Sequence, residues 1–211
     1  MLKLCFYKRP KDLNFLKKEV KAIQSFGLDI KFKQDDKLGF PNDGYFELKN
    51  QAKFHPLKFL FALAKKASEN GGLIFEHTPA QSISSNSPYI VKTPGGQIQA
   101  KSVILATYSP FNKPLELFFK QGKYISYIID SKIPKGRLPE GIYEDFEEPY
   151  HYFRLDTQKD HNHLILGGED HRKELKIDPN RNFNALIEFF GELFPDLELK
   201  LVRKWQGPIS N

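Results

Sequence analysis

The chain contains a tyrosine and an arginine whose spacing suits recognition of a carboxylate. Tyr152 and Arg154 are two residues apart in a segment rich in β-forming residues, and side chains at positions i and i+2 of a strand share a face of the sheet. The guanidinium group is a planar fork of donors that can bind a carboxylate through two parallel hydrogen bonds. The pair therefore predicts a binding site for a carboxylate; a surface cation–aromatic pair is the alternative interpretation.

Two histidines, His161 and His163, have the same spacing near an expected turn. They could ligate a metal ion, but no further ligand stands at a convincing spacing. Histidines on a polar hairpin are more often exposed to solvent, so we expect no metal site. The single cysteine, Cys5, excludes an internal disulfide and any cysteine-based zinc or iron–sulfur site within this chain. This cysteine usage suits a reducing compartment.

Composition and charge exclude several other classes of function. Lys and Arg number 32 and Asp and Glu number 26, which gives a net charge of +6. The basic residues are scattered among acids and form no stripe, so we expect no nucleic-acid partner. No apolar run approaches the roughly 20 residues of a membrane span, and the first residues lack a signal-peptide core. We therefore expect a cytoplasmic protein without a membrane partner.

Three helices are expected from apolar residues at helical spacing. The first follows a capping Asp12 and ends near Gly27, and the second begins at Pro56 and ends at Gly71. A third covers residues 182–194 and stops before Pro195. In the second helix, a buried stripe is expected from Leu57, Leu60, Leu63, Ala64 and Ala67.

The strands suggest an α+β protein. A short strand at residues 73–76 and a hairpin of residues 89–93 and 97–100 precede an apolar run, Val103-Ile104-Leu105-Ala106, which is typical of a strand covered on both faces. Later strands are expected at residues 123–130, 150–156, 163–167 and 197–205. This order predicts an α+β fold in which a mostly antiparallel sheet with flanking helices is attached to a partial nucleotide-binding layer.

Three groups of segments are informative when they are read together. They are residues 51–60 with GGLIFEHTPA at 71–80, residues 93–96 with AKSVILATYSPF at 100–111, and residues 152–154 with LILGGEDH at 164–171 and 203–205. Their succession resembles the D-amino-acid oxidase-like (glycine oxidase/DadA) family of FAD-dependent oxidoreductases. The resemblance is greatest to the branch that often carries a Rieske iron–sulfur domain, and it covers nearly the whole chain.

The resemblance implies a division into two parts. Residues 1–55 and 115–206 would form the substrate-binding antiparallel-sheet domain, and residues 56–114 would form part of the FAD-binding domain. The family's N-terminal Gly-x-Gly-x-x-Gly unit, which holds the FAD pyrophosphate, is not found in the sequence. The chain thus looks like an internal piece of a flavoenzyme. We expect that this chain alone neither binds FAD nor is active.

The resemblance also implies roles for individual residues. Ala80 maps to a position that meets the adenine edge, with an ordinary strand residue as the alternative. Ala106 and Thr107 map to a strand end beside the cofactor, and a tightly packed strand end is an equally compatible interpretation. Tyr152 and Arg154 would bind the substrate carboxylate. His171 could assist them, although an exposed loop residue is the more common outcome, and Trp205 is expected in the core.

The implied function is the substrate-binding portion of an FAD-dependent oxidoreductase that acts on amines or amino acids by hydride transfer to the flavin. A cofactor-less binding module, or a truncated gene remnant of the same ancestry, is the alternative. If flanking elements are missing, apolar surface around Val103-Ile104-Leu105 is expected to be exposed and to favour self-association or a missing FAD-binding half as partner.

Overall fold

A computed structural model describes residues 2–7, 13–107, 122–145 and 147–210. The expected Asp12 cap, the end of the second group of segments and the expected domain boundary at 114–115 lie outside these residues. Contacts between residues divide the chain into two compact units: residues 1–53 with 122–211, and residues 54–121.

The larger unit is built on one eight-stranded sheet with the strand order β11-β7-β10-β9-β8-β1-β3-β2. Its described pairs are antiparallel except for β1 with β8, which is parallel. The strands are β1 (Leu2–Tyr7), β2 (Phe32–Lys33), β3 (Gly44–Leu48), β7 (Lys123–Ile133), β8 (Gly141–Asp145), β9 (His151–Thr157), β10 (Asn162–Arg172) and β11 (Lys200–Ser210).

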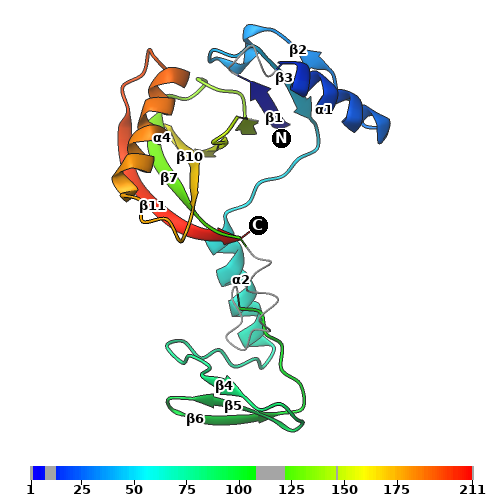
Figure 1. The fold of residues 1–211 in the computed structure, drawn as a ribbon, viewed down its shortest axis with the longest axis vertical. Coiled ribbons are helices and arrows are strands. Elements are labelled where there is room, and N and C mark those ends of the chain that lie inside the picture. Colours follow the sequence, from blue (N-terminus) through cyan, green and yellow to red (C-terminus); the bar gives the residue numbers. More distant parts are fainter. Residues whose placement is uncertain (1, 8–12, 108–121, 146, 211) are drawn as a thin grey trace. The chain divides into compact units, whose positions relative to one another are not determined.

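Helix α4 (Pro179–Leu193) covers one face of this sheet and packs on β7 and β10 (Figure 1). It begins earlier than expected because Pro179 occupies the first turn and the Asp178 side chain caps the Asn180 N–H. Its apolar stripe joins side chains of β7, β9 and β10 in the main core. The fully buried members include Phe153, Leu155, Leu164, Leu166, Ile129, Leu186 and Phe190.

A second core lies at the other end of the unit. Helix α1 (Leu13–Ser25) was expected from its periodicity and buries Leu16 and Val20. These side chains pack with Ile30 and with Phe46 of β3. A short 3-10 helix, η2 (Asp36–Leu38), is capped by Asp35 and joins β2 to β3.

The smaller unit holds helix α2 (Pro56–Glu69) and a three-stranded sheet of β4 (Ser82–Ile83), β5 (Tyr89–Thr93) and β6 (Gly96–Ala100). The expected helix and hairpin are therefore confirmed. The buried stripe expected on α2 is wrong, because no residue of this helix is buried. Its leucines and phenylalanines are more than half exposed, from 51% at Leu63 to 67% at Phe61.

Two expected strands of the smaller unit do not form. Residues 73–76 and 103–106 have no strand structure, although both runs are apolar. A strand is defined by hydrogen bonds to a neighbour, and no described strand pairs with either run. Ile104 is 89% exposed and Leu105 39% exposed, which confirms the expected exposure of this apolar run. The α+β class itself is confirmed.

Candidate functional site

The face of the large sheet turned away from α4 carries Tyr152 and Arg154. Along β9, buried residues alternate with half-buried ones, as a strand with one covered face requires. Phe153 and Leu155 lie in the core against α4, so Tyr152 and Arg154 project from the opposite face. The structure therefore brings these two side chains onto one side of the sheet.

Tyr152 is held by its neighbours on that face. Gly167 of β10 pairs directly with it, and its phenol oxygen lies 3.4 Å from the Ser126 hydroxyl of β7. The ring also stacks with Tyr150 at a centroid distance of 6.0 Å. Burial raises the pKa of Tyr152, so the phenol remains protonated at neutral pH and can donate a hydrogen bond.

Arg154 has a similar setting on the same face. It pairs with Ile165 of β10 and with Ile142 of β8. On β8, Glu144 stands opposite Tyr152. Phenol, guanidinium and carboxylate groups therefore share one stretch of sheet, a set able to bind a small zwitterion by its carboxylate and its ammonium group.

His171 lies elsewhere. It belongs to β10 rather than to a loop, and an irregularity in the β10–β7 ladder brings it opposite Ile125. Its ring stacks on Tyr127 at 5.6 Å, and Tyr127 in turn contacts Phe183 of α4. His171 therefore lies on the helix-covered face, and the structure does not bring it together with Tyr152 and Arg154.

The three residues implied for cofactor binding belong to the smaller unit. Ala80 lies just before β4, and Ala106 and Thr107 lie in the segment without strand structure. All three are exposed. Their roles remain predictions.

A pyrophosphate site can be tested at the helix N-termini that the structure describes with their caps. A phosphate is bound there by free N–H groups of the first turn. In α4 the Asp178 carboxylate already accepts the Asn180 N–H, and its negative charge opposes an anion. In α2 the His55 Nδ1 accepts the Lys58 N–H at 3.4 Å, and Pro56 contributes no donor. These two ends do not fit the FAD pyrophosphate.

A cluster around His151 is a feature that sequence reasoning missed. Its Nδ1 lies 2.9 Å from Asp145 and its Nε2 3.0 Å from Glu169, and the ring stacks on Phe189 of α4 at 3.7 Å. Burial lowers the pKa of His151, but the hydrogen bonds and charges of Asp145 and Glu169 outweigh it and raise that pKa to about 9. The three residues come from β8, β9 and β10, and no spacing along the chain indicates their contact.

A second cluster contains the two histidines expected in solvent. His163 Nδ1 lies 2.6 Å from the carboxylate of Asp130, which is fully buried and also binds Arg203 Nε at 2.8 Å. The His163 side chain is only 18% exposed. The expectation that both histidines are exposed to solvent is therefore wrong for His163. The reason is the partner on β7, which the local sequence cannot show. Among the described residues, no group of three or more potential ligands is arranged to hold a metal ion.

Trp205 is also not in the core. It lies on β11, at the edge of the strand order, and is 39% exposed with Arg203 over its ring at 5.4 Å. An edge strand has a neighbour on one side only, which leaves its side chains more open to solvent.

Comparisons with known proteins give a family match, a sequence relative and structures that share the fold. The model of the family described as FAD dependent oxidoreductase matches residues 3–210. A relative, the putative Rieske 2Fe-2S iron-sulfur protein YhfW of Bacillus subtilis strain 168, is 30% identical over 127 residues, which are 59% of this chain and 25% of the relative. This similarity supports the branch that carries Rieske domains.

Solved structures share the fold. Glycine oxidase from Geobacillus kaustophilus superposes with a TM-score of 0.81 at 15% identity, over 99% of this chain and 58% of that one. L-proline dehydrogenase from P. horikoshii superposes with a TM-score of 0.77 at 16% identity, over 99% of this chain and 60% of that one. The chain thus spans a quarter of the curated relative and about three fifths of these structures. In the part of the chain that the structure describes, no helix has the length and apolarity needed to cross a membrane.

Proposed function

This chain belongs to the FAD dependent oxidoreductase family, and on that premise we propose that it is the substrate-binding portion of an enzyme acting on amines or amino acids. The observation that carries the proposal is the placement of Tyr152 and Arg154 side by side on the sheet face away from α4. A bound flavin would supply the redox chemistry by accepting a hydride from a C–H bond beside nitrogen.

The chain's own residues would bind and orient the substrate. The Arg154 guanidinium would hold the substrate carboxylate through two parallel hydrogen bonds, and the neutral Tyr152 phenol would donate another. The contacts of Tyr152 with Ser126 and Gly167 would fix its ring, so that its hydroxyl needs little reorganisation on binding.

The described helix ends do not fit a pyrophosphate, so we place that part of the cofactor on elements outside the described residues. The exposed apolar side chains of α2, with Ile104 and Leu105, are the natural surface for such a FAD-binding half to cover. On this proposal, residues 1–211 alone bind no FAD and have no activity.

A flavin spectrum tests the proposal. The protein is produced from its full reading frame at a concentration on the order of tens of micromolar. Its absorption is then recorded between about 350 and 500 nm, where an oxidised flavin absorbs. We expect a bound flavin that is bleached anaerobically by an amine or amino acid, with glycine and L-proline first in the panel because of the fold relatives. A folded, colourless product would contradict the proposal.

A cofactor-less binding module is the second candidate, and the occupied caps of α2 and α4 favour it. The same experiment separates the two. A colourless protein that still binds amino acids, with loss of binding in Arg154→Met, would support the module.

A further inference from the structure

We infer that His161 and His163 form a bidentate site for a late transition-metal ion such as Cu²⁺, Ni²⁺ or Zn²⁺. The two rings stand at the start of β10, and their Nε2 atoms are 3.1 Å apart. Their ring centroids are 4.9 Å apart. The site lies within the larger unit and does not depend on the proposed function.

The distance between the nitrogens matches two ligands of one ion. Imidazole nitrogens bind such ions at about 2.0–2.1 Å. With bonds of this length, a separation of 3.1 Å corresponds to an N–metal–N angle of about 98°, between the square and tetrahedral values. The positions of the rings agree, because lone pairs that converge on one ion place the ring centres about 4.8 Å apart.

A simple hydrogen bond between the two imidazole rings agrees less well with the distance between their centroids. A linear N–H···N contact of this length would extend along both ring axes and separate the centres by about 5.4 Å. The observed 4.9 Å shows that the two rings are bent out of this linear arrangement, and their planes are tilted by 46°. Both values are compatible with lone pairs that converge on one ion.

Asp130 prepares His163 for this role. Its buried carboxylate lies 2.6 Å from His163 Nδ1, so the neutral ring carries its proton there and presents the Nε2 lone pair. Metal-binding histidines commonly have this carboxylate behind them, and it makes the ring a better ligand. Asp130 is itself fixed by Arg203 Nε at 2.8 Å.

The charges around the pair are balanced. His163 pairs with Asp156 of β9 on one side and with Lys132 of β7 on the other, and the charge of Asp130 is matched by Arg203. Two neutral nitrogen donors in a balanced field favour imidazole-preferring ions over Mg²⁺ or Ca²⁺, which prefer oxygen ligands.

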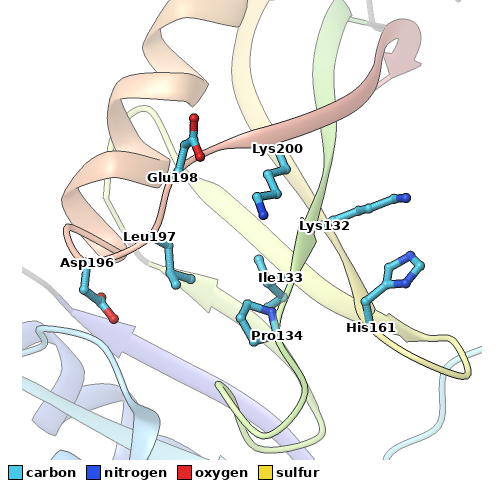
Figure 2. A pocket seen from close by; sticks show the side chains of 8 residues that line it. All are labelled: Lys132, Ile133, Pro134, His161, Asp196, Leu197, Glu198 and Lys200. Carbon is cyan, nitrogen blue, oxygen red and sulfur yellow. The ribbon is translucent and has the colours of Figure 1, made fainter.

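A pocket lined by His161 would give an ion and its water ligands access to that ring. It has a volume of about 400 Å³, and His161 lies in its wall with Lys132, as Figure 2 shows. With two protein ligands, the remaining coordination positions would be filled by water. An ion bound there would link the last residue of the turn between β9 and β10 to the first residues of β10.

Titration with Cu²⁺ alone tests the inference, because Cu²⁺ binds most strongly to nitrogen sites. The full 211-residue chain is titrated with CuSO₄ in a non-coordinating buffer, and the visible absorption and EPR spectrum are recorded. We expect one equivalent bound through two nitrogens. His161→Gln and His163→Gln should each weaken binding at least about tenfold, whereas the control His77→Asn, on the smaller unit, should leave it unchanged.

Asp130→Asn provides an independent readout. Loss of the carboxylate behind the ring should weaken Cu²⁺ binding by roughly 10–100-fold while the two-nitrogen EPR signature remains. Thermal unfolding checks that each variant folds; if Asp130→Asn does not, His161→Gln decides alone. Equal affinity of the wild type and the His161→Gln/His163→Gln double variant, or an equal loss in His77→Asn, would overturn the inference.

Discussion

Gly167 leaves the space that the ring of Tyr152 occupies. The two residues are paired across β9 and β10, and a Cβ at position 167 would overlap the phenol ring. The absence of a side chain at one position thus sets the place of the aromatic side chain at the other.

Gly167→Ala should therefore displace Tyr152. We expect it to destabilise the protein by about 1–3 kcal/mol, because the added methyl group overpacks the site. Urea unfolding measures this. In a Tyr152→Ala background the same change should cost little, since the ring is gone. Gly191→Ala is the matched control: nothing lies within 4 Å of its Cβ, and alanine in a helix should stabilise by about 0.5–1 kcal/mol.

His151 should make stability depend on pH. Its pKa is raised to about 9 in the folded protein, above the value of about 6.5 expected when unfolded. The contribution of His151 to the free energy of unfolding is therefore fully present below about pH 6.5 and is lost as the pH rises through about 9. Between pH 6 and pH 10 we expect the free energy of unfolding of the wild type to fall by up to about 3 kcal/mol more than that of His151→Gln. Parallel pH profiles of the two proteins would contradict this origin.

Arg154→Lys should separate binding from catalysis in the flavin-loaded enzyme of the proposed function. Lysine keeps the charge but not the planar fork, so KM for amino acids should rise roughly tenfold with little change in kcat. An amine without a carboxylate should show no such change. Equal effects on both substrates would place Arg154 away from the carboxylate.

The exposed apolar side chains of the smaller unit should make the 211-residue chain associate. Phe61 is 67% and Ile104 89% exposed, and large exposed apolar side chains of this kind favour association. Phe61→Asp with Ile104→Asp should lower the sedimentation coefficient at high concentration without lowering the melting temperature, because neither side chain is buried. A wild type that sediments as a monomer at all concentrations would disagree with this expectation.

Local patterns predicted the helices and the hairpin, whereas long-range pairing decided which other segments became strands and which side chains were buried. The helix beginning at Pro56 and the hairpin around residue 94 follow from capping, periodicity and turn residues. Trp205 could not be placed, because its exposure depends on the position of β11 in the sheet. Likewise, the shared face of Tyr152 and Arg154 follows from the strand period, whereas the setting of His171 depends on an irregularity in a ladder with a distant strand.

The parallel pair of β1 and β8 has a consequence for synthesis. Leu2 pairs with Gly141, so β1 finds this neighbour only after the residues between them have been translated. At roughly 5–20 residues per second, that delay is on the order of ten seconds. The large sheet therefore cannot be completed until β8 has been synthesised, and contacts between such distant residues predict slow folding.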